Sequence, residues 1–198
     1  MPIGTHKILL FTGGGGERIW YSEDNDARTF MSNWNYSGEI YNMTNLGAFG
    51  NSWVHGWGGS ARTYELTLNN IPGHTQIKYQ AKYHMVDSWD NEYNEVRITT
   101  GASNSGTLTY ASWRKTWSNA YLDSVSTNYG ATLNFVSGVD YSYEPWNGSN
   151  DATNGYADFD SNWQNHSASS IRIFQRTDLD QAASDEAYYI SHATLWIR

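Results

Sequence analysis

Oxygen-bearing side chains are concentrated in two short runs of this chain, each beside a strand-like segment. The first run, Asp87-Ser-Trp-Asp-Asn-Glu92, follows the alternating segment 75–85, and the second, Asp178-Leu-Asp-Gln-Ala-Ala-Ser-Asp-Glu186, precedes the segment 188–198. Calcium takes about six to eight oxygen ligands from carboxylates, carbonyls and water. Neither run has the EF-hand spacing, so an irregular loop would have to arrange the ligands. The alternative is that these side chains cap turns by bonding their own backbone.

Aromatic side chains next to polar ones form a second set of candidates. A flat ring beside Asp, Asn or His suits a sugar, which presents both an apolar C–H face and hydroxyl groups. The Gly-rich run Trp53-Val-His-Gly-Trp-Gly-Gly is the strongest candidate, because loops expose side chains for recognition. Trp89 beside the first acidic run, Trp146 with Asn147, and Trp163 with Asn162 are further candidates. For Trp89 we favour the alternative that its ring closes one end of the fold. The expected ligand-binding residues are Trp53, His55, Trp57 and Trp89.

Catalytic patterns are weak. Glycoside hydrolysis needs two carboxylates that face one bond, but Glu92 and Glu95 have opposite registers in a strand. Asp90 and Glu92 are expected to share a face, although nothing marks either as an acid catalyst. The sequence contains no Gly-x-Ser-x-Gly elbow, and its six histidines lack metalloprotease spacing. We therefore predict that the protein is not an enzyme and has no catalytic residues.

Composition excludes several classes of function. The 198 residues contain no cysteine, which rules out disulfides and thiolate zinc sites. The net charge is −8 and the cations are scattered, whereas phosphate binding needs clustered cations. No nucleic-acid partner is therefore expected. No stretch approaches the ~20 apolar residues of a membrane span. Ten tryptophans and fifteen tyrosines favour half-exposed strands and binding surfaces.

Hydrophobic periodicity predicts an all-β fold. Residues 75–85 alternate strictly, with Ile77, Tyr79 and Tyr83 on one face and Lys78 and Lys82 on the other. Such alternation places one face of a strand on a core and the other in solvent. Turn-rich stretches such as 146–156 separate the segments, and none has a helical period. An antiparallel β-sandwich or jelly roll follows. Further strands are expected at 7–12, 64–68, 95–98, 106–111, 131–136, 171–176 and 188–198.

The N-terminal segment has a different composition. Residues 1–45 include the Gly13–Gly16 run and a polar, aromatic stretch at 34–41. This segment is expected either to supply edge strands or to form an arm that packs on a neighbour in a homo-oligomer, and we favour edge strands. The sandwich domain itself is expected to span 46–198.

Two motifs carry a resemblance to known proteins. A Pro-Gly-His-Thr turn at 72–75 leads into an alternating strand and then into Asp-Ser-Trp-Asp-Asn-Glu at 87–92. This order resembles β-sandwich surface modules found in ciliate surface, bacterial exported and phage structural proteins. In their C-terminal part, Asp-Glu-Ser-Trp-Gly-Ile precedes the last strand. Here Ala187-Tyr188-Tyr189 replaces Ser-Trp-Gly, and the resemblance covers about residues 60–198. It implies that the carboxylates are ion ligands.

Together these features predict a non-catalytic, surface-facing β-sandwich that binds carbohydrate or another polar surface ligand in a lectin-like manner. We expect a calcium ion held by Asp87, Asp90, Glu92, Asp185 and Glu186, because an ion would order acidic loops that otherwise repel one another. The expected location is extracellular, on a cell surface or on a virion surface. The alternative function is a structural subunit of a virion appendage or an extracellular fibre.

Overall fold

All regular structure in the described part of the chain is β-strand. The computed structural model describes residues 16–23, 34–36, 41–43, 52–54, 62–87, 89–100, 106–116, 119–138, 154–180 and 186–198. The strands are β1 (Arg18–Glu23), β2 (Trp34–Tyr36), β3 (Tyr41–Met43), β4 (Ser52–Val54), β5 (Arg62–Asn69), β6 (Gln76–Asp87), β7 (Asp90–Thr100), β8 (Thr107–Thr116), β9 (Leu122–Asn128), β10 (Thr132–Ser137), β11 (Gly155–Asp160), β12 (Gln164–Asn165), β13 (Ser170–Thr177) and β14 (Glu186–Ile197). No helix suited to crossing a membrane occurs in these residues.

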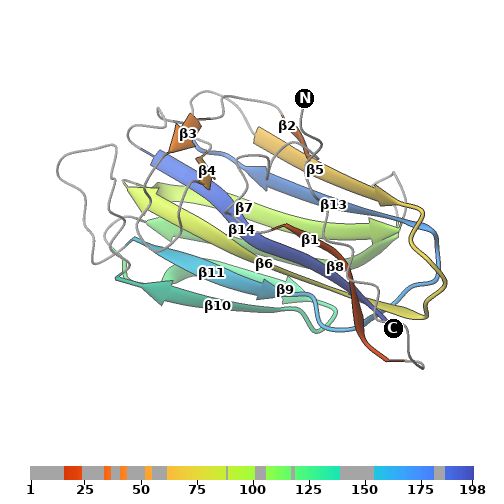
Figure 1. Ribbon diagram of the computed structural model, residues 1–198. Helices are drawn as coiled ribbons and strands as arrows, with labels where there is room; N and C mark the ends of the chain where they lie inside the picture. The colour runs from red at the N-terminus through yellow and green to blue at the C-terminus, as the bar shows by residue number, and fades with distance from the viewer. Residues whose placement is uncertain are drawn as a thin grey trace.

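Two six-stranded antiparallel sheets pack against each other as a sandwich (Figure 1). The first sheet has the order β1-β14-β6-β11-β10, and the short strand β12 also pairs with β6. The second sheet has the order β2-β5-β13-β7-β8-β9, and β3 pairs with β4 in a separate ribbon. The prediction of an antiparallel β-sandwich is therefore confirmed. The sequence segments that alternate most regularly lie at the centres of the two sheets.

Strand β6 shows why the sequence folds in this way. Its residues Ile77, Tyr79 and Tyr83 are buried, with relative exposures of 0–1%, whereas Lys78 and Lys82 on the other face are partly exposed. Successive side chains of a strand point to opposite faces, so the strict alternation gives β6 one core face and one outer face. Because β6 pairs with β14 on one side and β11 on the other, its outer face lies at the middle of the first sheet.

Large aromatic side chains connect the two sheets in the core. The Tyr83 ring of the first sheet lies 5.6 Å from the ring of Trp113 on β8, measured between centroids. The Trp113 indole N–H lies 3.3 Å from the sulfur of Met85 on β6. Trp113 and Tyr83 are both fully buried. Aromatic pairs of this kind contribute about 0.5–1.5 kcal/mol beyond the area that they bury, so this contact helps to fix how one sheet lies on the other.

Close backbone approach at one glycine brings β10 and β11 together. Gly155, the first residue of β11, is paired with Ser137 of β10. A Cβ atom at Gly155 would lie 2.2 Å from the Val136 carbonyl oxygen and 2.7 Å from the Phe135 ring. Any larger residue would push the two strands apart. The glycine therefore allows β10 to complete the outer edge of the first sheet.

Strands from the N-terminal segment occupy outer positions in both sheets. β1 pairs with β14 from Arg18↔Ile197 onward, and β2 pairs with β5 through Trp34↔Leu66. The described part of residues 1–45 therefore pairs with strands of the same chain. The strand expected at 7–12 lies outside the described residues.

Strands β9 and β11 are among those that the sequence analysis did not expect. β9 is polar and mostly exposed, as suits the edge strand of the second sheet. β11 begins at Gly155, inside the stretch 146–156 that was expected to be turn-rich throughout. Its buried residues are Gly155, Ala157 and Phe159. Only Phe159 among them is a large apolar residue, so the alternation is weak in the sequence.

Candidate functional site

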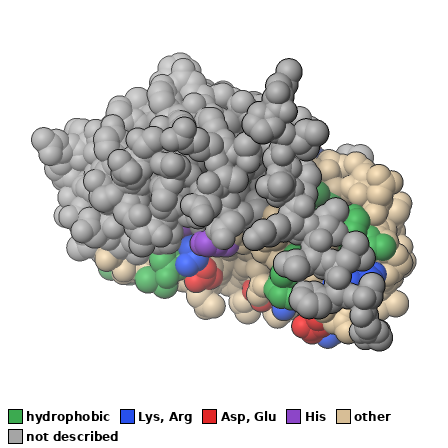
Figure 2. Space-filling view, in the orientation of Figure 1, with side chains coloured by type: hydrophobic (Ala, Val, Ile, Leu, Met, Phe, Trp, Pro, Cys, Tyr) green, Lys and Arg blue, Asp and Glu red, His purple; other side chains and the backbone are tan. Residues whose placement is uncertain are grey.

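A groove of about 550 Å³ crosses the outer face of the first sheet. Four neighbouring strands contribute to it, in the order β14, β6, β11 and β10. Its polar lining residues are Gln80, Lys82, Thr132, Asn134, Asp158, Asp160, His192 and Thr194. Figure 2 shows a histidine beside a basic and an acidic side chain on one face of the molecule. We call this feature the sheet groove.

Period-2 alternation positions most of these side chains. Gln80 and Lys82 are outward residues of β6, and Asp158 and Asp160 are outward residues of β11. The backbone pairing places Asp158 opposite Lys82, and Asp160 opposite Gln80. His192 reaches the groove differently. The register of β14 shifts between Ser191 and Thr194, and His192 has a positive φ of 54°, so this irregularity exposes the imidazole at the groove.

Asp160 is held in place by hydrogen bonds to both carboxylate oxygens. Its Oδ2 accepts from Gln80 Nε2 at 2.7 Å, and its Oδ1 accepts from the Asn162 backbone N–H at 2.7 Å. The Gln80 Oε1 atom in turn accepts from the Trp196 indole N–H at 2.9 Å. This chain fixes the Gln80 amide and the Asp160 carboxylate before any ligand arrives. Preorganised polar groups of this kind reduce the ordering cost of binding.

Asp158 and Lys82 form a looser pair. The Lys82 ammonium lies 3.6 Å from Asp158 Oδ1 and 3.7 Å from the centre of the Tyr156 ring. The Asp158 side chain is 47% exposed, whereas that of Lys82 is 21% exposed. An exposed ion pair contributes little to stability. Because nearly half of the Asp158 side chain is exposed, its carboxylate keeps accessible oxygen atoms that can accept hydrogen bonds from a ligand.

Indole rings and cations extend along β6 beyond the groove. The Lys78 ammonium lies 5.0 Å from the Trp163 ring centre and 5.3 Å from that of Trp196. The Arg198 guanidinium lies 4.2 Å from the Trp163 ring. Such contacts are attractive because the face of an aromatic ring carries negative charge. Both rings are partly exposed, so the groove has an aromatic margin.

A neutral, buried histidine lies on this same face, opposite Tyr156 in the pairing of β6 and β11. His84 of β6 is fully buried, and its ring lies 5.5 Å from the Tyr156 ring. Burial lowers the pKa of His84 well below its usual value, and the nearby Lys82 and His192 lower it further. His84 is therefore uncharged near neutral pH. It packs beside Tyr156 across the strand pair without adding charge to the groove.

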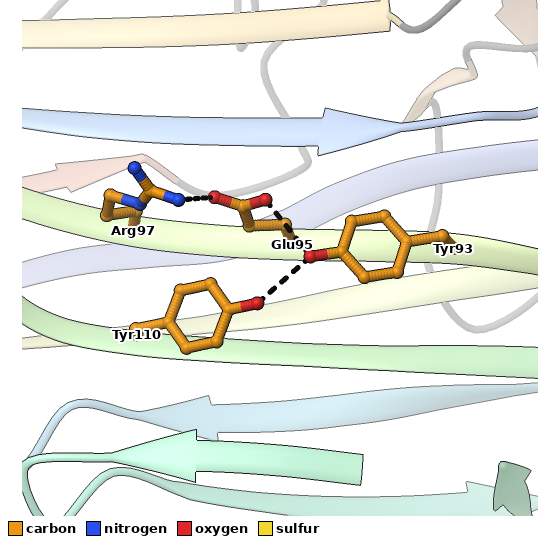
Figure 3. Close-up of polar contacts among 4 residues, drawn as sticks. All are labelled: Tyr93, Glu95, Arg97 and Tyr110. Carbon is orange, nitrogen blue, oxygen red and sulfur yellow. Dashed lines mark hydrogen bonds and ion pairs between the residues drawn. The ribbon is translucent and has the colours of Figure 1, made fainter. Parts of the chain in front are cut away.

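The outer face of the second sheet carries a separate polar cluster, made of Tyr93, Glu95, Arg97 and Tyr110 (Figure 3). Glu95 Oε1 accepts from Arg97 at 2.5 Å, and Glu95 Oε2 accepts from the Tyr93 hydroxyl at 3.0 Å. The Tyr93 and Tyr110 hydroxyl oxygens are also 3.0 Å apart. Burial, followed by the contacts with Tyr110 and Glu95, raises the pKa of Tyr93. Its hydroxyl therefore stays protonated. We call these four residues the tyrosine–arginine cluster.

The backbone brings the two predicted acidic runs together at one point. The last residue of β6, Asp87, is paired with the first residue of β14, Glu186. The side chains of both residues, and all of Asp185, lie outside the described part of the structure. Asp178 Oδ1 accepts a hydrogen bond from the Tyr93 backbone N–H, which joins the second run to the strand that follows the first. The calcium site stays a prediction.

Two acidic residues of the first run do not share a face, which corrects the expectation for Asp90 and Glu92. Asp90 is paired with Thr116, whereas Glu92 is paired with Lys115, the preceding residue of β8. The shift is a β-bulge at Asn91, which has a φ of 94°. As a result Asp90 is exposed, whereas Glu92 is 6% exposed and accepts from the Asp90 backbone N–H. Glu92 thus caps its own turn. No group of three or more potential metal-binding side chains occurs among the described residues.

Trp89 does not present its ring to solvent, which favours the alternative interpretation over a ligand-binding role. It is 1% exposed, and its ring lies 6.2 Å from the Tyr188 ring. A ring buried to this degree closes the end of the core, as the alternative interpretation proposed. For Trp53 only the backbone of β4 is described, and His55 and Trp57 lie outside the described residues.

Sequence reasoning identified little of the groove. Among the aromatic candidates, Trp163 with Asn162 lies beside it, since Asn162 bonds Asp160 and Trp163 contacts Lys78. The signal for Gln80 and Lys82 was present in the polar face of the alternating strand 75–85. The signal for Asp158 and Asp160 was the Tyr-Ala-Asp-Phe-Asp alternation of β11, inside a segment dominated by turn-forming residues.

Comparison with known proteins finds distant structural matches. No family model matches the chain, and no curated protein matches it. Solved structures with a similar β-sandwich include the mannan-recognising carbohydrate-binding module TmCBM27, with 10% identity over 93% of this chain and 99% of that one, at a TM-score of 0.45. TmCBM61, solved with β-1,4-galactotriose, has 10% identity over 89% of this chain and 100% of that one, at a TM-score of 0.41. A sialidase has 10% identity over 83% of this chain but 17% of that one, at a TM-score of 0.28.

Proposed function

We propose that this protein is a non-catalytic carbohydrate-binding β-sandwich and that the sheet groove holds the glycan. The observation that carries the proposal is the composition of the groove. It combines fixed acceptors and donors on four strands with partly exposed indole rings along the same face. Sugars present hydroxyl groups and apolar C–H faces, and both of these chemistries are met here. Small polar ligands are commonly recognised by a few well-placed polar groups in a concave site.

The charges in the groove favour a neutral glycan over a polyanion. Asp158 and Asp160 face the groove with Lys82, and Lys82 already has Asp158 as its ion partner. A sulfate or carboxylate on the ligand would meet two carboxylates and no unpaired lysine. The chain as a whole carries a net charge of −8, which adds long-range repulsion. Hydroxyl groups, in contrast, can donate to the exposed oxygens of Asp158.

The contacts of Asp160 support a non-catalytic role for the groove. Both of its oxygens accept hydrogen bonds from fixed donors, which suits a permanent acceptor better than an acid that must release a proton. General acid catalysis needs a carboxyl group that can carry and deliver a proton to the leaving oxygen. We therefore propose that both groove carboxylates orient hydroxyl groups.

Affinity electrophoresis in gels containing soluble polysaccharides tests the proposal. The panel contains neutral glucans, mannans and galactans together with alginate and heparin as polyanions. We expect retardation by at least one neutral polymer and by neither polyanion. Loss of one charge-assisted hydrogen bond costs about 1.5–3 kcal/mol, roughly 10- to 100-fold in affinity. Asp158→Ala should therefore bind at least about tenfold more weakly.

A matched pair of asparagines provides the control. Asn134 on β10 lines the groove, whereas Asn128 on β9 is equally exposed but lies on the second sheet. Asn134→Ala should weaken retardation and Asn128→Ala should not. Equal effects, or retardation unchanged in Asp158→Ala, would place the glycan elsewhere. Release of reducing ends during incubation would contradict the non-catalytic assignment.

A further inference from the structure

Two connections between the sheets run side by side at one end of the sandwich. Residues 70–75 lead from β5 of the second sheet to β6 of the first, and residues 166–169 lead from β12 back to β13. The Ile71 N–H donates to the Ser169 carbonyl at 3.0 Å, and the His166 N–H donates to the Thr75 carbonyl at 3.0 Å. The two connections are therefore already joined through their backbones. A pair of histidine side chains adds a second link.

The imidazoles of His74 and His166 meet edge to edge. The His74 Nε2 atom lies 2.7 Å from the His166 Nδ1 atom. The two rings are inclined by only 19°, and their centroids are 5.0 Å apart. Because the centroids are much further apart than the two nitrogens, the rings do not overlap face to face. They are nearly coplanar and point at each other through one nitrogen each, which is the geometry of an N–H···N hydrogen bond.

The remaining two nitrogens are each bound to a backbone carbonyl. His74 Nδ1 lies 2.6 Å from the Pro72 carbonyl oxygen, and His166 Nε2 lies 3.1 Å from the Ser170 carbonyl oxygen. A carbonyl oxygen only accepts, so both of these nitrogens must carry a hydrogen. If both rings were neutral, these two hydrogens would be the only ones present. The inner nitrogens would then face each other with two lone pairs at 2.7 Å, which is repulsive.

We infer that His74 and His166 share a third proton, so that the pair carries one positive charge and forms a pH-dependent clip between the two inter-sheet connections. With three hydrogens on four nitrogens, every contact of the pair has one donor and one acceptor. The charge rests on His74, which is half-exposed, whereas His166 is only 5% exposed. His74 Nε2 then donates to the lone pair of His166 Nδ1.

The neighbouring charged groups agree with a single charge. The Arg18 guanidinium donates to the Gly73 carbonyl at 3.1 Å, one residue before His74. The Arg198 guanidinium donates to Gln76 at 2.6 Å and lies 3.3 Å from Glu17. None of the carboxylates in the described residues forms a hydrogen bond with either ring. A second proton on the pair would therefore have no counter-charge in contact with it, next to two guanidinium groups.

Acidification should open this clip. Burial lowers the pKa of His166, and the adjacent charge of His74 lowers it further. In the unfolded chain a histidine takes up its proton near pH 6.5, whereas folded His166 does so only at lower pH. The unfolded state therefore binds more protons below about pH 6.5, and stability falls as the pH falls through this range. The segment released first should be 161–169, which includes Trp163 at the margin of the groove.

Nuclear magnetic resonance of the full chain, labelled with ¹⁵N in histidine, tests the proton count directly. Two-bond ¹H–¹⁵N correlations at pH 7.5 should show His74 with both nitrogens protonated and His166 protonated at Nε2 alone. Two neutral rings at this pH would overturn the inference. Addition of one equivalent of Zn²⁺ should leave both spectra unchanged. Broadening of both rings with a rise in the unfolding temperature would instead make them metal ligands.

Variants test the consequence for stability. His166→Gln should reduce the drop in unfolding temperature between pH 6.5 and pH 5.5, because it removes the proton uptake of the unfolded state in this range. Gln76→Ala is the matched control, since Gln76 begins β6 directly after the first connection and its replacement removes bonds to Asn165 and Arg198 without touching either ring. It should lower the unfolding temperature at both pH values and leave the drop unchanged. An unchanged drop in His166→Gln would overturn the clip.

Discussion

The two outer faces of the sandwich use their polar side chains in opposite ways. In the tyrosine–arginine cluster the partners satisfy one another. Glu95 uses both oxygens inside the cluster, and the Arg97 guanidinium also lies 5.7 Å from the Tyr110 ring centre. In the sheet groove Asp158 and Asn134 keep exposed atoms. Groups that are fully satisfied within the fold stabilise it, whereas polar groups with spare capacity on a fixed frame can bind a ligand.

This difference follows from the strand pairing. On the second sheet, Arg97 lies opposite Tyr110, and Glu95 and Tyr93 precede Arg97 by two and four residues on the same face. Long side chains of complementary chemistry therefore meet. On the first sheet, the shorter Asp158 and Asp160 lie opposite Lys82 and Gln80, and the next strand offers only Thr132 and Asn134. Short side chains beside long ones leave the hollow that becomes the groove.

The largest expected effect separates folding from binding. Glu95→Ala removes the acceptor for Arg97 and Tyr93 in a side chain that is only 7% exposed. Removing one partner of a buried charged pair typically costs about 3 kcal/mol, which would lower the unfolding temperature by roughly 6–12 °C. Glycan retardation should stay within about twofold. Asp158→Ala should show the reverse, with weak binding and nearly normal unfolding. If Glu95→Ala lost binding while it remained folded, the cluster would be part of the ligand site.

Calcium tests whether the carboxylates at the acidic strand ends can bind a ligand, as those of the sheet groove can, or are satisfied within the fold, as in the tyrosine–arginine cluster. If Asp87, Asp90 and Glu186 hold an ion, saturating calcium at about 100 times its Kd should stabilise the protein by about 2.7 kcal/mol. Thermal unfolding in calcium and in excess EDTA measures this difference. The stabilisation should disappear in Asp90→Asn. Identical curves would mean that these carboxylates cap turns, as Glu92 does for the Asp90 N–H.

The strands at the centre of each sheet could be predicted from the sequence because they alternate over many residues. The outward and inward residues of β6 agree with the sequence prediction from Gln76 to Tyr83, whereas His84, which was expected to face solvent, is fully buried. The bulge at Asn91 could not be predicted, since one inserted residue changes the face of Asp90 without changing any local preference. Periodicity reports the faces of a regular strand, and it fails where the ladder is interrupted.

The candidate site could be predicted only in part. Trp163 and Asn162 were identified as an aromatic and polar pair, but the groove itself depends on which strands become neighbours. Lys82 and Asp158 are 76 residues apart in sequence and meet because β11 pairs with β6. Many pairings of short antiparallel strands satisfy the same alternation pattern. Partners across the sheet therefore become known only from the fold.

A smaller effect concerns a buried lysine at the second sheet. Lys115 is 2% exposed, and its ammonium donates to the carbonyls of Thr116 and, at 2.7 Å, Asn119. Burial lowers the pKa of Lys115 to about 8, although Asp123 opposes the shift. Between pH 8 and about 10.4 the unfolded chain binds the extra proton, so stability should rise with pH through this window.

Denaturant unfolding measured at several pH values should show a gain on the order of 2 kcal/mol from this lysine. Above about pH 10 the gain should reverse, because buried Tyr79 and Tyr83 have raised pKa values and their unfolded counterparts ionise first. Lys115→Met should flatten the rise and leave the reversal in place. A rise that persisted in Lys115→Met would have to come from another base.

The smallest effect lies within the tyrosine–arginine cluster and grades its members. Tyr110→Phe removes the hydroxyl that contacts Tyr93 but leaves the packing of the ring intact, so Arg97 keeps its aromatic partner. A single neutral hydrogen bond contributes about 1 kcal/mol or less. Tyr93→Phe should cost more, because Glu95 Oε2 then loses its donor in a buried position. Equilibrium unfolding of the two variants and of the double variant measures the coupling. A coupling near zero would mean that the two hydroxyl groups act independently, and that Glu95 and Arg97 alone hold this face closed.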